Sequence, residues 1–474
     1  MGELKVYINS VNNIFSAAVY MADDNGKTVI ITEEPGNNGQ SALGFAAGDV
    51  GGGKFRAELT HENACALRRL FPWTAPVRGL SRPASFGLGD RLGIAAPGHI
   101  DLFKNNDVFP VFAQQSIREL NLTNRTYEDV LDAATFAVFR EGYKKGFGAD
   151  GDHLKTAKDV EYALSLGFTM ITLDCSDYIK NNVNAENAPP LSQYYKDKYL
   201  NREFFIEDFV LVFSEDELRQ CAAIYAGAVS FAADIYKNFF ASGKYDADFE
   251  ISIDETFSVT APLQHFFTAR ELLDAGVKFA AIAPRFCGEF QKGIDYIGDT
   301  AQFEKEIRIH AAVARHLGHK LSIHSGSDKF SVFAAIGRET RGCFHIKTAG
   351  TNWLEAMRIT ARKDPPLYRA IHCFALSVFE DAKKYYHVTT DLSQIPDISA
   401  MKDEDLPEMF NNNGARQLIH ITYGFILRQK NDDGSFMFRD RLYNLWRENE
   451  DEYRAALVKH IGKHLELLFE GVKS

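Results

Sequence analysis

One pattern recurs eight times between residues 108 and 391: a short apolar run that ends in polar residues, in most cases followed by sequence with helical periodicity. Strand followed by helix, repeated in this way, favours a parallel β-sheet covered by helices. Eight units are typical of a barrel, although a doubly wound open sheet gives a similar alternation. We therefore predict an α/β fold, a TIM-like (β/α)8 barrel. The predicted strands are residues 108–115, 146–153, 168–174, 249–255, 279–285, 320–324, 343–347 and 387–391.

The sequence on either side of this repeat is different. The start of the chain combines short β-like runs with turn-rich stretches, and residues 82–99, rich in Gly and Pro, are predicted to be a long loop that enters the barrel. Residues 454–469 carry one apolar helical face. We predict an N-terminal β-rich region (1–100), a barrel (101–400) and a helical C-terminal extension (401–474). Helices between the strands are predicted at residues 127–143, 157–166, 215–239, 301–317 and 366–384.

A polar and aromatic insertion, residues 177–208, follows one of the predicted strands. Active sites of parallel barrels form where the chain leaves the C-terminal ends of the strands. The insertion is therefore either a lid over such a site or a decorated surface loop, and the sequence leaves both interpretations open.

Charge and composition exclude several classes of protein. The 474 residues are 45% apolar and 25% charged, with a net charge of −11, which disfavours nucleic acid or an anionic membrane as the main partner. We find no signal peptide and no run approaching the ~18 apolar residues of a membrane span. Six scattered cysteines fit free thiols in a reducing cytoplasm. An oligomer is compatible with the sequence, which does not set the oligomeric state.

Histidines stand at three of the predicted strand ends. Because these ends converge in a barrel, His153, His324 and His345 are predicted to bind a catalytic divalent metal ion. His310 is the strongest substitute should one of the three not be a ligand. The competing interpretation is structural, since a lone histidine more often packs than binds metal.

Carboxylates and small polar loops accompany these histidines. Asp152 and Glu255 come from different strands and are predicted to be an acid/base pair with the substrate between them. The alternative is that Asp152, Asp254 and Glu255 orient metal ligands through hydrogen bonds, which we prefer for Asp254. Residues predicted to contact a polar or anionic substrate are Gln115, Arg285, Ser325, Asp328, Lys329, Lys347 and Thr348.

Six sequence blocks resemble those of one family, the tagaturonate epimerases (also called tagaturonate/fructuronate epimerases). The resemblance extends from about residue 82 to residue 424 and is carried by residues 112–116 (FAQQS), 146–153 (GFGADGDH), 252–256 (SIDET), 293–296 (GIDY), 323–330 (IHSGSDKF) and 345–351 (HIKTAGT). It implies a cytoplasmic, divalent-metal-dependent isomerase of hexuronate catabolism that interconverts D-tagaturonate and D-fructuronate, which differ at C4. The family's acid/base residues would fall on Asp152 and Glu255, and a metal ligand on His153.

The chemistry of the two sugars suggests a mechanism. The C4 hydrogen lies β to the C2 ketone and is not acidified by it, so we expect a metal-assisted retro-aldol cleavage and re-addition rather than deprotonation at C4. His and carboxylate ligands suit Zn, Mn, Fe, Co or Ni. Two alternatives remain: a metal-dependent ketose/aldose isomerase or class II-type aldolase acting on a sugar acid or ketohexose, and a non-catalytic sugar-acid-binding barrel.

Overall fold

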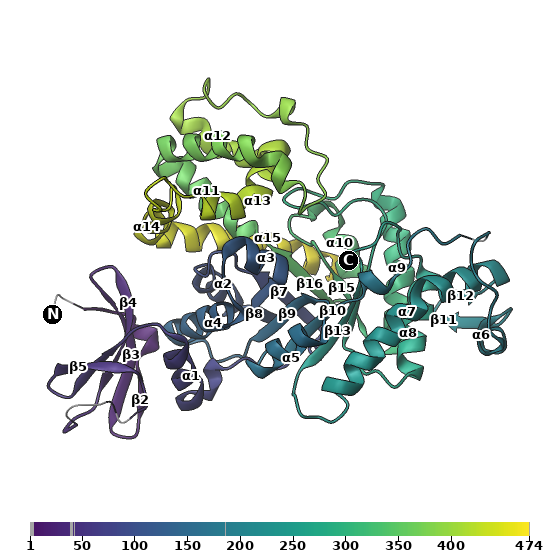
Figure 1. Ribbon diagram of the computed structural model, residues 1–474, viewed down its shortest axis with the longest axis horizontal. Helices are drawn as coiled ribbons and strands as arrows, with labels where there is room; N and C mark the ends of the chain where they lie inside the picture. The colour runs from purple at the N-terminus through teal and green to yellow at the C-terminus, as the bar shows by residue number, and fades with distance from the viewer. Residues whose placement is uncertain (1–3, 38–40, 42, 185, 474) are drawn as a thin grey trace.

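A closed barrel of eight parallel strands forms the centre of the computed structural model, which describes residues 4–37, 41, 43–184 and 186–473 (Figure 1). Around the barrel the strand order is β10-β13-β14-β15-β16-β7-β8-β9. The predicted α/β barrel is therefore confirmed. The strands are β7 (Ala84–Gly89), β8 (Phe109–Ser116), β9 (Gly148–Leu154), β10 (Met170–Asp174), β13 (Asp248–Ile253), β14 (Ala281–Pro284), β15 (Lys320–Ile323) and β16 (Phe344–Ala349).

One predicted strand is wrong and one real strand was predicted to be a loop. Residues 387–391 form no strand, and β7 lies inside the predicted entry loop, where it closes the barrel between β16 and β8. The sequence does not indicate β7, because every one of its residues is buried and several are small. Polar and apolar positions therefore do not alternate along it. Gly87 has no room for a side chain, because a Cβ there would come within 1.8 Å of Oε1 of Gln114. The predicted boundary after residue 100 has to move, because a barrel that began at residue 101 would lack β7.

Helices cover the outside of the barrel. The five predicted helices are present within a few residues of their expected ends, four of them in this layer and the fifth, predicted at residues 366–384, outside it. Two of them begin with capping boxes, at Thr126 and Ser214, where the side chain and the third helical residue exchange hydrogen bonds. The helices of this layer are α2 (Ala96–Phe103), α3 (Ile117–Thr123), α4 (Tyr127–Glu141), α5 (Ala157–Ser165), α7 (Glu215–Phe239), α8 (Pro262–Asp274), α9 (Thr300–Leu317) and α10 (Phe330–Glu339).

The chain returns to the barrel with its last helix. α15 (Glu450–Lys473), predicted from its apolar face, packs between α10 and α2, with Leu457, Ile461, Leu465 and Leu468 buried. The approach to α10 is close, since a Cβ at Gly337 would come within 1.8 Å of the carbonyl oxygen of Leu468. A C-terminal helix thus completes the helical layer beside β7 and β16.

The N-terminal β-rich region is an antiparallel sheet that projects from one end of the molecule (Figure 1). Its own core joins residues of the sheet, such as Val19 and Ile30, to Leu67 of α1 (His61–Leu70) and Phe139 of α4. The sheet is therefore anchored on the barrel's helical layer. Its strands are β1 (Lys5–Val6), β2 (Asn12–Ile14), β3 (Ala17–Asp24), β4 (Lys27–Glu33), β5 (Ala47–Gly51) and β6 (Lys54–Ala57).

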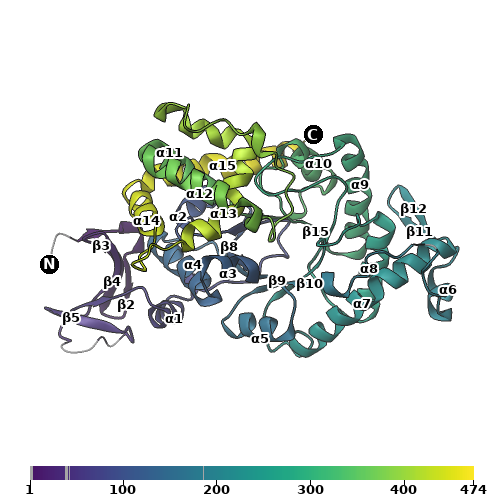
Figure 2. The same ribbon diagram turned by 45° about the horizontal axis from the view of Figure 1, so that its top comes forward.

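Four helices form a second block beside the barrel, in green and yellow in Figures 1 and 2. They are α11 (Thr351–Lys363), α12 (Pro365–Ala382), α13 (Asn413–Arg428) and α14 (Arg439–Glu448). Their buried side chains, including Trp353, Tyr368 and Trp446, share one core that is distinct from the barrel core. Residues 351–382 therefore pack with the helical extension, although the predicted barrel ran to residue 400.

The insertion after β10 packs on the outside of the barrel. It contains α6 (Gln193–Tyr199) and the hairpin β11 (Glu203–Ile206) and β12 (Phe209–Val212). Tyr199 is fully buried, and its hydroxyl donates to Glu271 of α8 at 2.5 Å. None of its described residues lines the cavity discussed below, so the structure favours a surface decoration over a lid. Across the described parts of the chain, every helix is too short or too polar to cross a bilayer.

Candidate active site

Strand geometry brings a row of polar residues into the barrel. Side chains two apart on a strand share a face, so Asp150 and Asp152 of β9 lie together, as do Glu250 and Ser252 of β13. His153 has a φ of +55°, in the left-handed region that non-glycine residues rarely adopt. This local break in the alternation allows the consecutive residues Asp152 and His153 both to line one cavity.

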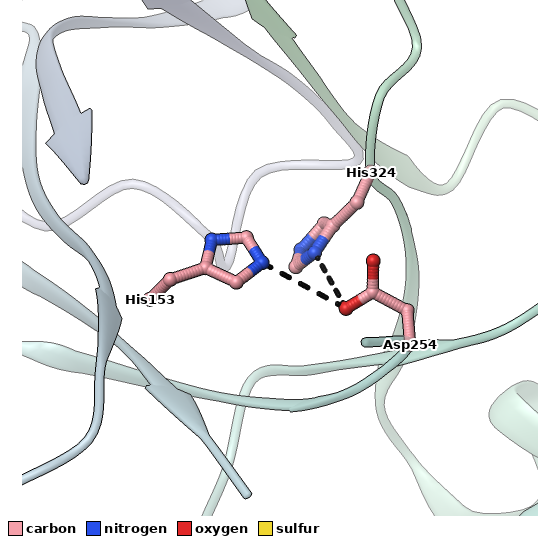
Figure 3. A group of neighbouring side chains, drawn as sticks. All are labelled: His153, Asp254 and His324. Carbon is pink, nitrogen blue, oxygen red and sulfur yellow. Dashed lines mark hydrogen bonds and ion pairs between the residues drawn. The ribbon is translucent and has the colours of Figure 1, made fainter. Parts of the chain in front are cut away.

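Three side chains from three strand ends meet in that cavity. One ligand atom from each of His153, Asp254 and His324 lies within 4.8 Å of the other two (Figure 3). Asp254 Oδ1 is 3.1 Å from Nδ1 of His324 and 3.8 Å from Nε2 of His153. The donor set of two imidazole nitrogens and one carboxylate is one that divalent transition metals favour, with positions left for water or substrate.

Each histidine is held from behind by a carboxylate. His153 uses Nδ1 toward Asp152 Oδ1 at 2.8 Å, and His324 uses Nε2 toward Glu250 Oε1 at 2.8 Å. The other ring nitrogen of each histidine therefore faces Asp254. A carboxylate behind a histidine fixes the ring and its tautomer, as in many metal centres. The residues present thus fit a divalent ion bound by His153, Asp254 and His324.

The same carboxylates act on the pKa values of the cluster. Burial would lower the pKa of His153, but the charge and hydrogen bond of Asp152 raise it well above its ordinary value. Burial would raise the pKa of Asp254, yet its two histidine neighbours hold that pKa well below its usual range. Asp254 is therefore ionised and available as a ligand.

Lys347 lies at the centre of the carboxylates. Its Nζ is 2.7 Å from Asp150 Oδ2, 2.5 Å from Asp152 Oδ1 and 3.4 Å from Glu250 Oε1, and it donates to Thr172 Oγ1 at 2.6 Å. Burial opposes the charge on Lys347, but the three carboxylates raise its pKa. For Asp150 burial dominates, and its pKa is raised to about 6 despite Lys347. The ammonium is saturated by protein groups, so its role is to hold Asp152 and Glu250 in place.

The cluster opens into a cavity of about 560 Å³. Glu255 stands at the junction, with its side chain 35% exposed and Oε1 3.2 Å from a guanidinium nitrogen of Arg118. Burial would raise the pKa of Glu255, but His153 and Arg118 lower it, so the carboxylate is ionised. The outer wall comes partly from the helical extension. It includes Phe257, Arg285, Tyr385, Tyr386 and His387.

His345, predicted to be a metal ligand, does not reach this group. The predicted strand ended at Lys347, but β16 continues to Ala349, so His345 is its second residue and lies deep in the barrel. Its Nδ1 pairs with Ser85 Oγ at 2.9 Å, and burial lowers its pKa to about 3. The predicted ligand His345 therefore lies outside this group, and Asp254, expected from the sequence to orient ligands, supplies the third donor atom of the cluster.

His310, the predicted substitute ligand, lies elsewhere. It belongs to α9 and is buried against another histidine, with its Nδ1 3.1 Å from Nδ1 of His265. The sequence could not show this, because a buried face of a helix accepts a histidine as readily as a strand end does.

Two predicted substrate contacts bind other groups of the protein, and a third lies away from the cavity. Lys329 is buried and donates to the carbonyl oxygens of Gln291, Ile294 and Ser327 at 2.6–2.8 Å. Asp328 is paired with Arg416 and His460. Gln115 is buried but lines neither part of the cavity, which its neighbour Gln114 reaches instead. Loop residues that follow a strand are expected to face the substrate. Asp328 instead pairs with α13 and α15, and Lys329 with backbone carbonyls of its own loop and of the loop before α9.

Asp328 also belongs to a second group with metal-ligand geometry, together with His460 and His464. There the donor atoms are already engaged: Asp328 by Arg416 at 2.5 Å, and His464 by the amide of Asp328 at one ring nitrogen and the carbonyl of His460 at the other. This group joins α13 and α15 to the barrel and lines neither part of the active-site cavity.

The remaining predicted residues do line the cavity, and the structure adds others. Predicted and present are Asp152, His153, Glu255, Arg285, His324, Ser325, Lys347 and Thr348. Not predicted are Arg118, Lys292 and Tyr386, which line the cavity, and Glu250, which holds His324 from behind. Glu250 could have been noticed as a charged residue inside a predicted strand, two positions before Ser252 and four before Asp254. Nothing in the sequence indicates Arg118 or Lys292, because the pattern of a helix or a loop does not show which of its residues line a cavity.

Known proteins that match this chain over nearly its whole length belong to one family. A family described as UxaE, tagaturonate epimerase, matches residues 7–468. The tagaturonate/fructuronate epimerase of Thermotoga maritima is 42% identical, covering 98% of this chain and 97% of that protein. The fructuronate-tagaturonate epimerase UxaE of Cohnella laeviribosi, crystallised in its native form and with one glycerol, is 48% identical with a TM-score of 0.94, over 98% of this chain and 97% of that one. This chain therefore belongs to the tagaturonate epimerase family and is an isomerase.

Proposed function

We propose that this protein interconverts D-tagaturonate and D-fructuronate at C4, using a divalent metal ion bound by His153, Asp254 and His324. The names of its relatives support the pair of sugars. One observation supports the metal: two histidines, each backed by a buried carboxylate, face the same aspartate at the base of a cavity. The identity of the ion stays open among Zn, Mn, Fe, Co and Ni.

The reaction is a retro-aldol cleavage followed by re-addition. A divalent ion at this site supplies a Lewis acid for the C2 carbonyl oxygen of the ketose. Removal of the C4 hydroxyl proton breaks the C3–C4 bond, leaving an aldehyde at C4 and an enediolate on the three-carbon fragment. After the aldehyde turns by half a rotation, the C3–C4 bond forms again on its other face. The C4 alkoxide then regains its proton, so atoms and charge balance.

Two carboxylates are placed to move the proton. Glu255 is ionised and stands in the cavity, paired with Arg118, and we assign it the removal of the C4 hydroxyl proton in one direction. Asp152 also lines the cavity, at its inner end, and Lys347 and His153 keep its pKa well below the usual range although burial opposes this. Asp152 is then the group that exchanges a proton on the other face of the sugar.

The wider setting follows from charge and cysteine chemistry. All six cysteines are free thiols, which supports a reducing, cytoplasmic location. The net charge of −11 supports a small substrate bound in a local pocket over a polyanionic partner.

Proton NMR of the purified protein with D-tagaturonate tests this function. We expect D-fructuronate to appear, to be lost on chelation and to return when Mn²⁺ or Zn²⁺ is added. D-Tagaturonate deuterated at C4 tests the mechanism, because retro-aldol chemistry keeps the deuterium on C4 without a large primary isotope effect. Loss of deuterium to solvent would exclude it, and a large primary effect would indicate oxidation at C4 instead. An aldehyde or three-carbon fragments as the final products would point to an isomerase or aldolase.

A further inference from the structure

Lys292 is a cation that the protein leaves without an ionic partner. It lies between β14 and α9 and lines both the inner and the outer part of the active-site cavity. Its ammonium donates to Ser325 Oγ at 3.0 Å. Within the described ranges 4–37, 41, 43–184 and 186–473, no carboxylate oxygen lies within 4.0 Å of Lys292 Nζ. An ammonium has three donors, and the bond to Ser325 uses one of them, so donors remain for a ligand in the cavity.

Other cations in and around the cavity differ from Lys292 in this respect. Lys347 is bound by three carboxylates, and Lys329 by three backbone carbonyls. Arg91 is paired with Glu119 at 2.9 Å, and Arg118 with Glu255 at 3.2 Å. Each of these charges has a partner of the chain at ion-pair or hydrogen-bond distance, whereas among the described residues Lys292 has only the hydroxyl of Ser325.

The surroundings make an unpaired charge costly. Burial and the positive charges of Arg118 and Arg91 lower the pKa of Lys292, and the carboxylates of Glu119 and Glu255, which lie beyond ion-pair distance, offset this only in part. A partly buried ammonium is tolerated when an anion or several hydrogen bonds stabilise it, and the chain provides one hydroxyl. An anionic ligand in the cavity would supply the missing charge.

The backbone that carries Lys292 is held in place before any ligand binds. Gln417 of α13 donates to the carbonyl oxygen of Lys292 at 3.2 Å. The side chain of Gln291 bonds to Thr389, and its carbonyl oxygen accepts from Lys329 at 2.8 Å. A cation on a fixed support loses little entropy when it binds an anion, which favours specific recognition.

Lys292 also stands next to the proposed metal site. Its partner Ser325 follows His324 directly in the chain and has a φ of +50°. The ammonium is therefore beside the metal group but separate from the carboxylates that hold the histidines. Lys292 and Arg118 line the same cavity as His324, so one ligand can contact both the histidine cluster and Lys292.

We propose that Lys292 binds the C6 carboxylate of the substrate and sets the preference for ketohexuronates over neutral ketohexoses. This inference rests on the proposed function. A neutral ketohexose carries a hydroxymethyl group at C6. It binds less tightly, because the ammonium of Lys292 then stays in the cavity without a counter-charge. Arg285, one of the residues predicted to contact an anionic substrate, is the competing residue. It lies in the outer wall near Glu289, at 3.8 Å.

The test compares two substrates that differ in this one group, D-tagaturonate and D-tagatose. We expect Lys292→Met to lower kcat/KM for D-tagaturonate on the order of 10²–10³-fold while D-tagatose changes less than about threefold. Lys292→Arg should retain more of the activity on D-tagaturonate than Lys292→Met does, because it keeps the charge. Lys305→Met, an exposed lysine of α9, is the matched control and should leave both substrates unchanged. Thermal unfolding verifies that each variant is folded.

A binding measurement makes the outcome independent of turnover. Galactonate and galactitol share a carbon skeleton but differ in charge. We expect Lys292→Met to weaken the binding of galactonate and to leave the binding of galactitol unchanged. Equal losses for charged and neutral compounds would overturn the inference, as would no loss for either. A larger loss with Arg285→Gln than with Lys292→Met would assign the carboxylate to Arg285 instead. If the wild-type protein fails to epimerise D-tagaturonate yet the galactonate effect holds, the proposed function is wrong and the anion site remains.

Discussion

Nδ1 of His324 lies 3.1 Å from Oδ1 of Asp254, although 70 residues separate the two in sequence. Asp254 follows β13 and His324 follows β15, and β14 lies between these strands in the barrel. Side chains from strands that are not neighbours can meet because all eight C-terminal ends converge on one mouth. This contact defines the centre of the proposed metal site, and the predictions below depend on it.

Glu250 supports the metal site without touching the ion. Because Glu250 Oε1 accepts from His324 Nε2, we expect Glu250→Gln to weaken metal affinity about 10–100-fold and to leave the three ligands in place. Metal titration by calorimetry measures this. Glu289→Gln in the outer wall of the cavity is the control and should bind metal like the wild type. Unchanged affinity in Glu250→Gln would show that His324 is oriented by something else.

Glu255 is predicted to act on the substrate and not on the metal. We expect Glu255→Gln to lower kcat by about 10²–10⁴-fold, since the amide cannot accept the C4 hydroxyl proton, while metal affinity changes less than threefold. Steady-state kinetics together with the metal content of the same samples separates the two effects. Full activity in Glu255→Gln would remove this residue from the mechanism.

Lys347 is predicted to be structural. Lys347→Met leaves Asp150, Asp152 and Glu250 buried without their ammonium, and we expect a loss of about 3–5 kcal/mol in the free energy of unfolding. Adding Asp150→Asn removes one uncompensated charge, so the double variant should regain part of that loss. Calorimetric unfolding of the wild type, the two single variants and the double variant tests this. Strictly additive effects would contradict a shared charge network.

His345 should make the protein sensitive to acid. Burial lowers its pKa to about 3, whereas in the unfolded chain it takes up a proton near pH 6.5. The unfolded state therefore binds more protons between these pH values, so stability is complete above about pH 6.5 and is lost as the pH falls toward 3. We expect His345→Asn to make the slope of unfolding free energy against pH shallower by about 1.4 kcal/mol per pH unit in this window.

Two controls accompany the acid experiment. His387→Asn changes a side chain that is 70% exposed, so its stability curve should run parallel to that of the wild type. His345→Asn should also retain its bound metal, since His345 pairs with Ser85. Loss of metal in that variant would restore His345 to the ligand set.

Seven of the eight barrel strands follow from the sequence because each is a compact apolar run that ends in polar residues. β7 does not, since a strand of small residues buried on both faces lacks alternation. The position of a residue within its strand determines whether its side chain lies at the mouth of the barrel or deep inside it. A strand end misjudged by two residues placed His345 at the rim, whereas it lies deep in the barrel.

Cavity residues that lie outside the strands could not be predicted from the sequence. His153 and Glu255 were found because they stand at strand ends. Arg118 and Lys292 lie outside the strands, and only the folded chain shows that they line the same cavity. Lys329 illustrates the reverse case, because a lysine that follows a strand end satisfies three buried carbonyls rather than a ligand.

Anomalous diffraction from crystals grown with Mn²⁺ and D-tagaturonate tests the central claim most directly. We predict one strong peak bounded by His153, Asp254 and His324, with the sugar in the adjoining cavity beside Glu255. A peak at His345 or among Asp328, His460 and His464, or a bound sugar with no peak near it, would contradict the proposed metal site and the mechanism built on it.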